Sequence, residues 1–319
     1  MTISLAHLQA LHTAYGARMQ ENVSLMRYTA ARIGGKADVI ITVGTSEELA
    51  EVTKLCRELA ISFIILGSGS NVLVSDAGVR QVVVINHARK IVFNHHQQPT
   101  TVWVESGANF GALARKAAAK GLSGLEWAAG IPGTVGGAVY GNAGAQGSDM
   151  SKNLVMANIL HLRQTNGDCR CEILQEEWSV ERFEYAYRSS IIKRQPGQVV
   201  VLSAQLKLYQ STSDAVQAKM DEYQAMRRDS QPSGASLGSI FKNPPGDYAG
   251  RLIEAAGLKG KKLGNVEISQ KHANFFINQN NATASDYAGL IRLVQEKVLE
   301  KFGVSLELEI ELLGDWVDR

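Results

Sequence analysis

The spacing of apolar residues along the first third of the chain changes from a helical to a strand period. Residues 45–48 read Thr-Ser-Glu-Glu, the pattern of a helix-capping box, and apolar residues at helical spacing continue as far as Leu59. This segment is predicted to be a helix, and the apolar run at residues 61–66 is predicted to be the strand after it. Shorter apolar runs predict strands at residues 72–74, 82–85, 91–93 and 101–105. The alternation indicates an α+β domain with a mixed sheet.

Helical and strand patterns continue through the middle of the chain. Residues 110–120 are rich in alanine and predict a second helix, which ends at Gly121 because glycine favours a left-handed cap. Residues 154–162 and 169–174 predict a hairpin, because the Asn-Gly pair between them supplies the positive φ angles of a tight turn. Residues 199–208 predict the strand that closes this half.

Beyond residue 210 the pattern becomes mainly helical. Helices are predicted up to Arg228, after Asp247 and over residues 285–302, with a strand at residues 273–278. Residues 304–313 alternate apolar side chains with serine and three glutamates, which predicts a half-buried strand. We therefore predict a domain over residues 1–209, with subdomains at about 1–85 and 86–209, and a C-terminal domain over residues 210–319.

Composition argues for small-molecule partners. The 319 residues carry 33 Lys and Arg against 31 Asp and Glu, so the formal charge of +2 lacks the strong positive field that nucleic-acid or anionic-membrane binding needs. The apolar runs fall far short of the roughly 20 residues that span a bilayer, so no membrane span is predicted. No secretory signal pattern is expected either. The chain is predicted to be cytoplasmic.

The three cysteines are not expected to carry chemistry. Cys56, Cys169 and Cys171 are an odd number, and the reducing cytosol keeps such residues as thiols. Cys169 and Cys171 form a Cys-x-Cys motif without a second ligand pair nearby, so no metal site is predicted.

A glycine loop follows the strand predicted at residues 61–66. Its sequence, Gly67-Ser-Gly-Ser-Asn71, lacks both the third glycine and helix of a dinucleotide fingerprint and the Gly-Lys-Ser/Thr of a P-loop. Backbone amides in such a loop can still form an anion-binding concavity. The alternative is a β-turn that needs glycine only for its φ angles.

A second glycine-rich segment holds nine glycines between Gly121 and Gly147. It also carries several apolar residues, Trp127 among them, which a flexible linker would not have. Two glycine-dense loops would let the backbone approach both sides of a long cofactor. Tight backbone packing is the alternative for the second loop.

Several motifs resemble one enzyme family. The stretch Gly124-Leu-Glu-Trp-Ala-Ala-Gly-Ile-Pro-Gly-Thr-Val-Gly-Gly-Ala-Val-Tyr140 is similar to the second flavin loop of the UDP-N-acetylenolpyruvoylglucosamine reductases, and residues 29–38 and 66–73 resemble its first flavin-contacting segments. Further matches in the family's order are Tyr185-Ala-Tyr-Arg-Ser-Ser190, Gly238-Ser-Ile-Phe-Lys-Asn-Pro244, Ala256-Gly-Leu-Lys-Gly260, Lys271-His-Ala273 and Leu306-Glu-Leu-Glu309. The C-terminal half has no long insertion, which resembles the shorter of the family's two subtypes.

The resemblance implies an α+β fold: an FAD-binding domain of the vanillyl-alcohol-oxidase / p-cresol methylhydroxylase type, made of two α+β subdomains, and a C-terminal α+β substrate-binding domain. It implies non-covalent FAD, with NADPH as co-substrate, and reduction of UDP-N-acetylglucosamine-enolpyruvate to UDP-N-acetylmuramate for peptidoglycan. A monomer is expected. The implied cofactor-binding residues are Arg32, Gly34, Gly67, Ser68, Gly69, Ser70, Asn71, Gly130, Ile131, Pro132, Gly133, Thr134, Gly136 and Gly137.

The resemblance also implies the catalytic residues. Arg188 matches the arginine that holds the substrate carboxylate, Ser239 the general acid, and Glu309 the carboxylate that helps to polarise or protonate the enol intermediate. Tyr187, Lys242 and Asn243 match substrate contacts. The chain departs from the family pattern at Gly141, Asn265 and Gln270, which bears on substrate-side contacts.

Each catalytic residue has an ordinary alternative on spacing alone. Arg188 would pair with Glu184 at the surface, and Ser239 would be a turn residue. Glu309 shares one strand face with its neighbours at positions 307 and 311, a pattern typical of a solvated face.

Two other functions compete at this level. A flavin oxidase or dehydrogenase of the same fold would act on an alcohol or hydroxy acid and use oxygen as acceptor, but the motifs around Arg188 and Ser239 argue against it. A flavin-binding module without catalysis would have lost Arg188, Ser239 or Glu309, and all three are present.

Overall fold

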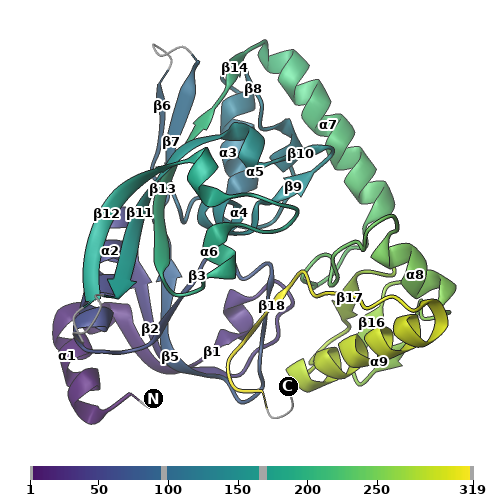
Figure 1. Cartoon of the computed structure of the whole chain (residues 1–319), viewed down its shortest axis with the longest axis horizontal. Helices are drawn as coiled ribbons and strands as arrows, with labels where there is room; N and C mark the ends of the chain where they lie inside the picture. The colour runs from purple at the N-terminus through teal and green to yellow at the C-terminus, as the bar shows by residue number, and fades with distance from the viewer. Residues whose placement is uncertain (1–2, 95–98, 165–170, 317–319) are drawn as a thin grey trace.

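The N-terminal part of the chain is built on a mixed four-stranded sheet. The computed structural model describes residues 3–94, 99–164 and 171–316 (Figure 1). The sheet has the order β1-β2-β5-β3, with β1 (Met19–Ser24), β2 (Lys36–Val43), β3 (Phe63–Leu66) and β5 (Val79–Asn86). The last three strands run parallel, so their carboxyl ends meet at one edge. The glycine loop after β3 therefore opens beside the loops that follow β2 and β5.

Two helices bury one face of this sheet. They are α1 (Leu5–Tyr15) and α2 (Ser46–Glu58), so the helix expected after Thr45 is confirmed. Thr45 accepts a hydrogen bond from Glu48 N at 3.2 Å, as a capping box requires. The Glu48 carboxylate, however, accepts its bond from Gly44 N at 2.7 Å instead of from Thr45 N. Cys56 lies in this core, where burial raises the pKa of its thiol to about 12.

A second, antiparallel sheet of five strands forms the middle of the molecule. Its order is β12-β11-β13-β7-β6, with β6 (Ile91–Asn94), β7 (Thr101–Glu105), β11 (Leu154–Gln164), β12 (Cys171–Ser179) and β13 (Val199–Lys207). The helices α3 (Phe110–Ala118) and α4 (Val135–Gly141) share its core. The hairpin of β11 and β12 is confirmed, while its expected turn and Cys169 lie outside the described residues.

Short elements connect these strands. They are the 3-10 helices η1 (Gly16–Arg18), η2 (Leu25–Tyr28), η3 (Glu126–Ala128) and η4 (Val180–Phe183), the helices α5 (Met150–Asn153) and α6 (Ile191–Arg194), and the strands β8 (Leu122–Ser123), β9 (Gly144–Ala145), β10 (Ser148–Asp149) and β14 (Tyr209–Gln210).

The C-terminal part packs helices on a small antiparallel sheet. The sheet consists of β15 (Lys262–Leu263), β16 (Val266–Ile268) and β17 (Phe276–Asn278), and its neighbouring helices are α8 (Ala249–Ala255) and α9 (Ala284–Phe302). The long helix α7 (Ser213–Ser230) leads into this part from the second sheet (Figure 1).

The end of the chain returns to the first glycine loop, and this corrects one prediction. Residues 304–313 were expected to form one strand, but only β18 (Glu311–Leu313) is a strand, and it pairs in parallel with β4 (Val72–Val74). Leu308 instead forms an isolated bridge with Phe241. The first half of the segment pairs with the chain near Phe241 and the second half pairs with β4. The alternating pattern is therefore divided between two short backbone pairings. Figure 1 shows it crossing from α9 toward the N-terminal sheet.

Among the described residues, no helix has both the length and the apolar character needed to cross a membrane.

Candidate active site

The two glycine loops pack directly against each other. A Cβ atom at Gly67 would lie 2.5 Å from Thr134 Oγ1, and Ser70 Oγ donates a hydrogen bond to Pro132 O at 3.3 Å. Gly69 has a φ of +58°, and its Cβ would lie 2.0 Å from Tyr28 O. In the first loop, Gly67 is therefore required for close packing against Thr134, and Gly69 is required both for close packing and for the positive φ that the β-turn alternative expected.

The first loop also offers unused backbone donors. Within the part of the chain that the structure describes, the N–H groups of Ser68, Gly69, Ser70 and Asn71 donate no hydrogen bond to the protein. Successive free amides in a tight loop suit an anionic group such as a diphosphate. Packing and ligand binding are thus compatible in this loop.

A helix follows the second loop, which the sequence pattern did not predict. Thr134 is the N-cap of α4, and its hydroxyl accepts a hydrogen bond from Gly137 N at 3.4 Å. Gly136 has no room for a side chain, because its Cβ would lie 2.8 Å from Ser106 Cβ. The apolar face of α4, with Val135, Ala138 and Val139, enters the core of the second sheet and holds the loop rigidly.

Alanine at Gly67 is expected to lower the free energy of unfolding by about 1–3 kcal/mol, the usual cost of overpacking. Gly141→Ala is the matched control, because a Cβ there meets nothing within 4 Å and alanine favours the helix. Urea unfolding of both variants measures the difference. Equal stability of the two variants would show that packing against Thr134 is not why Gly67 is needed.

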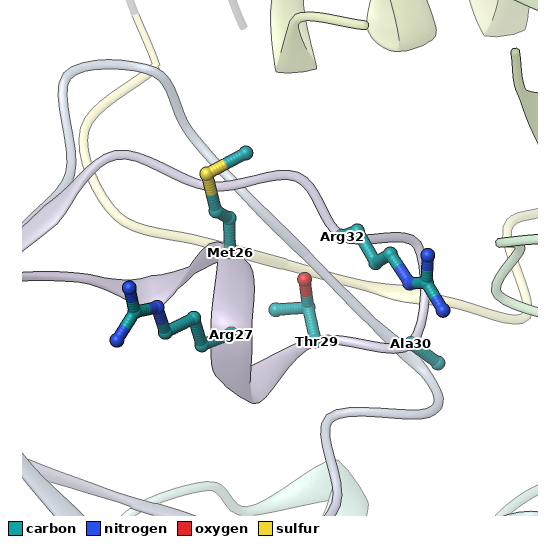
Figure 2. Close-up of a pocket in the computed structure, with 5 residues that line it drawn as sticks. All are labelled: Met26, Arg27, Thr29, Ala30 and Arg32. Carbon is teal, nitrogen blue, oxygen red and sulfur yellow. The ribbon is translucent and has the colours of Figure 1, made fainter. Parts of the chain in front are cut away.

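A cavity lies beside the first loop. It has a volume of about 580 Å³ and is lined by Met26, Arg27, Thr29, Ala30 and Arg32 (Figure 2). Ala30 N donates to Gly69 O at 3.0 Å, so the cavity borders the glycine loop. In Figure 2 the two arginines lie at opposite ends with Thr29 between them. Arg32 was expected at the cofactor site, whereas Arg27 was not singled out from the sequence.

Arg188 lies at the tip of a two-residue hairpin. Ala186 and Ser189 exchange two backbone hydrogen bonds, each 3.1 Å, and Arg188 adopts a φ of +53°. A positive φ is uncommon for residues other than glycine and tends to mark functional sites. Asn142 Nδ2 donates to Ala186 O at 3.0 Å, and Ser190 Oγ donates to Tyr140 O at 2.6 Å. The end of α4 therefore anchors the hairpin, which ties Arg188 to the second glycine loop.

Glu309 is held by two distant segments of the chain. Its backbone N–H donates to Ile240 O at 2.8 Å, and its carbonyl accepts from Asn71 Nδ2 at 3.1 Å. Its carboxylate Oε1 lies 2.8 Å from Arg188 Nε. The tertiary structure thus brings the first glycine loop, Arg188 and Glu309 together.

This arrangement removes two of the ordinary alternatives. Arg188 does not pair with Glu184, whose carboxylate lies 2.8 Å from Arg194 Nη2. Glu309 is not on a solvated face either, because its side chain is only 15% exposed, against 75% for Glu307.

Burial raises the pKa of Glu309 above its usual value, while the positive charges of Arg188, Lys193 and Lys242 act in the opposite direction. In this ion pair Arg188 uses Nε, and its Nη1 and Nη2 atoms make no hydrogen bond to a described residue. Its remaining N–H groups are therefore available to a ligand.

Glutamine at position 309 is expected to change how stability depends on pH. The raised pKa means that the folded state binds a proton at Glu309 more tightly than the unfolded chain does. The stability that this group contributes is therefore present below its unfolded pKa and is lost as pH rises through the folded pKa. The difference in unfolding free energy between the native protein and Glu309→Gln should fall over this range, by about 1.4 kcal/mol for each pH unit that separates the folded from the unfolded pKa. Urea unfolding across this pH range tests it, and a difference that grows with pH would contradict it.

Ser239 lies on the segment that positions Glu309. It forms an isolated bridge with Phe275, and the following residues pair with the Glu309 segment, Lys242 N donating to Glu307 O at 2.9 Å. In the described part of the chain, Ser239 Oγ makes no hydrogen bond to protein. A hydroxyl without a protein partner is available to a substrate.

Of the expected substrate-contacting residues, Tyr187 and Asn243 contact each other, and Lys242 precedes Asn243 in the chain. The Tyr187 hydroxyl accepts a hydrogen bond from Asn243 N at 3.4 Å, which joins the Arg188 hairpin to the C-terminal part. Lys242 Nζ lies 3.1 Å from Glu307 Oε2, in an ion pair that is exposed on the glutamate side.

Arg227 is a neighbour of the site that was not identified from the sequence. A Cβ atom at Gly130 would lie 3.5 Å from Arg227 Nε. Burial, together with the positive charge of Arg188, lowers the pKa of Arg227. An arginine near the end of a mainly polar helix carries no distinctive sequence signal, so only the structure reveals its position.

No group of three or more His, Cys, Asp or Glu residues within the described ranges is arranged to hold a metal ion.

The sequence matches known families over both parts of the chain. Residues 37–169 match an FAD binding domain, and residues 230–313 match the C-terminal domain of UDP-N-acetylenolpyruvoylglucosamine reductase. A UDP-N-acetylenolpyruvoylglucosamine reductase from Rubrobacter xylanophilus is 40% identical over 291 residues, 91% of this chain and 94% of the relative. Another from Chloroflexus aurantiacus is 39% identical over 292 residues, 91% of this chain and 95% of the relative. The chain belongs to the UDP-N-acetylenolpyruvoylglucosamine reductase family.

A solved structure of the UDP-N-acetylenolpyruvoylglucosamine reductase family agrees with this fold. The enzyme from Thermus caldophilus superimposes with a TM-score of 0.75 at 35% identity, covering 92% of this chain and 99% of that one. The predicted α+β class, with an FAD-binding domain before the family's C-terminal domain, is confirmed.

The boundary near residue 210 stays a prediction. Val216 and Met220 of α7 pack into the core of the second sheet, whereas the match to the reductase family's C-terminal domain begins at residue 230. Helix α7 therefore connects the two parts.

Proposed function

We propose that this chain reduces UDP-N-acetylglucosamine-enolpyruvate to UDP-N-acetylmuramate, with NADPH as reductant and FAD as cofactor. The observation that carries the proposal is the ion pair of Arg188 and Glu309, at 2.8 Å, on segments that are each fastened to one of the glycine loops. Peptidoglycan precursor synthesis is the corresponding role, and the cytoplasm the expected location. A monomer is the expected form.

The residues of the two loops fit FAD. Four free backbone amides between Ser68 and Asn71 supply donors for the diphosphate, and the close contact of Gly67 with Thr134 brings the second loop to the same place. The cofactor, when bound, accepts hydride from NADPH and supplies hydride to the β-carbon of the enolpyruvyl group. We propose the loop residues from Gly67 to Asn71 and from Gly130 to Thr134, with Gly136, Gly137, Arg32 and Gly34, as its binding residues.

Arg188 is proposed to hold the substrate carboxylate. A guanidinium binds a carboxylate through two parallel hydrogen bonds, and negative charge accumulates on this carboxylate and the adjacent α-carbon during reduction. Glu309 orients the guanidinium through Nε, which leaves its other N–H groups for the substrate. The Glu309 carboxylate, whose pKa is raised, is proposed to polarise or protonate the developing enol.

Ser239 is proposed to deliver the proton to the α-carbon. Its hydroxyl has no hydrogen-bond partner among the described residues, and its segment pairs with that of Glu309. Tyr187, Lys242 and Asn243, at the junction of the Arg188 hairpin and the C-terminal part, are proposed to contact the sugar and diphosphate.

An anaerobic absorbance experiment tests the function. The flavin spectrum of the purified protein should bleach with NADPH and return when UDP-N-acetylglucosamine-enolpyruvate is added. Recovery of the colour with oxygen alone would favour a flavin oxidase. A protein that takes up no FAD would overturn the proposal.

A further inference from the structure

A second ion pair joins the same two segments as the Arg188–Glu309 pair. Lys193, in the short helix after the Arg188 hairpin, places Nζ 2.9 Å from Glu311 Oε1. Glu311 lies two residues beyond Glu309, and its backbone N–H donates to Asn71 O at 2.8 Å. The Lys193 side chain is 16% exposed, so the pair is shielded on one side. Dissolved salt screens the attraction in such a partly buried pair less than in a pair at the surface.

The lysine is held at a defined place. Its backbone N–H donates to Ser190 Oγ at 3.1 Å, and the same hydroxyl donates to Tyr140 O at 2.6 Å. Lys193 is therefore fixed to α4, like Arg188 itself. Neither Lys193 nor Glu311 belongs to the residues that the family resemblance assigns to catalysis or binding.

We propose that Lys193 is a positioning residue for the reaction: its ion pair with Glu311 fastens the C-terminal segment in the register that presents Glu309 to Arg188. This inference rests on the function proposed above. Because the C-terminal segment changes its backbone partners between Glu309 and β18, its register there depends on few hydrogen bonds. A second side-chain contact two residues from Glu309 limits the positions that the carboxylate can take.

Lys193 also contributes to the charge around Glu309. The charges that act on this carboxylate are Arg188 on the hairpin, Lys193 on α6 and Lys242 on the segment after Ser239. Glu307 and Glu311, on its own segment, pair with Lys242 and Lys193. Removal of the Lys193 charge should raise the pKa of Glu309 further. Removal of the Glu311 charge frees Lys193 to act on Glu309, so it should lower that pKa.

The test compares Lys193→Met, Lys193→Arg and Glu311→Gln in the FAD-loaded protein. Stopped-flow absorbance measures reoxidation of the reduced flavin by UDP-N-acetylglucosamine-enolpyruvate as a function of pH. Lys193→Met should slow this step by about 10- to 100-fold, since small misplacements of catalytic groups cost this much. Reduction by NADPH should be unchanged, and Lys193→Arg should restore most of the rate.

A second measurement does not depend on turnover. It follows binding of the same substrate to the oxidised protein through the flavin spectrum across pH. The pH midpoint of the acid-side binding transition should be higher in Lys193→Met and lower in Glu311→Gln than in the native protein. Lys297→Met is the matched control, because Lys297 forms an exposed pair with Glu300 on α9, at 2.7 Å. It should leave both measurements unchanged.

The outcomes separate the two proposals. A native protein that NADPH reduces but this substrate does not reoxidise would overturn the proposed function and this inference with it. Normal turnover of the native protein, with Lys193→Met and Glu311→Gln behaving like Lys297→Met, would overturn the inference alone. Equal damage to both half-reactions in Lys193→Met, without rescue by arginine, would likewise overturn it.

Discussion

Alanine in place of Ser239 is expected to slow the reoxidation of reduced flavin by UDP-N-acetylglucosamine-enolpyruvate by about 10²- to 10⁴-fold, the usual cost of losing a general acid. The reason is that Ser239 Oγ has no partner among the described residues and lies on the segment that pairs with Glu309. Reduction of the flavin by NADPH needs no proton from this hydroxyl, so its rate should be nearly unchanged. Single-turnover stopped-flow absorbance measures both half-reactions.

A neighbouring serine supplies the control for this experiment. Ser233 lies a short distance before Ser239 in the chain but is exposed, so Ser233→Ala should leave both half-reactions close to those of the native protein. Equal slowing of both half-reactions in Ser239→Ala would contradict the role of proton donor. It would indicate instead that the substitution disturbs the site as a whole.

Glutamine in place of Arg188 is expected to reduce the same reoxidation step by about 10²- to 10³-fold, the usual cost of losing an electrostatic contact to a developing negative charge. The change removes the guanidinium 2.8 Å from Glu309 and leaves that carboxylate buried without its nearest positive partner. The pKa of Glu309 should then rise further, so the pH profile should change along with the rate. Arg188→Lys keeps the charge but not the planar fork, and its rate should lie between those of the native protein and Arg188→Gln.

Arg18→Gln is a suitable control for Arg188→Gln. Arg18 also forms an ion pair, at 2.6 Å with Glu48, but its side chain is 46% exposed and belongs to the N-terminal part. Surface pairs of this kind contribute little, so this variant should keep its full rate. If Arg188→Gln reoxidised as fast as Arg18→Gln, the substrate carboxylate would have to bind elsewhere.

Local patterns were sufficient for the longer elements after Thr45, whereas α1, β1, β2 and the helix α4 were not predicted. The helix after Thr45, the strand at residues 101–105 and the long helix before Phe302 occur where the periodicity predicts them, because caps and apolar spacing act over a few neighbouring residues. The prediction for residues 304–313 was wrong for most of its length. Alternation records which side chains are buried, but it does not record how many backbone partners a segment has.

The candidate site likewise has some features that the sequence indicated and others that only the fold shows. Sequence motifs and their resemblance to a family were enough to name Arg188, Ser239 and Glu309, yet periodicity treated the three C-terminal glutamates alike. The fold distinguishes Glu309, because the hydrogen bonds of its backbone to Ile240 and Asn71 turn its carboxylate toward Arg188. Arg227 and Lys193 carry no motif of their own, and only their positions in space connect them with the site.

By itself, then, the sequence determined the α+β class, the two glycine loops and the family, since these depend on residue types and short spacings. Only the tertiary structure decided that the two loops touch, that Arg188 adopts a positive φ and that Glu309 is buried against it. Apart from the local hairpin of Arg188, these features depend on contacts between residues far apart in the sequence: Gly67 with Thr134, 67 positions apart, and Arg188 with Glu309 and Asn71 with Glu311, each more than a hundred positions apart. Their formation requires the packed cores of both parts of the chain, which no local pattern records.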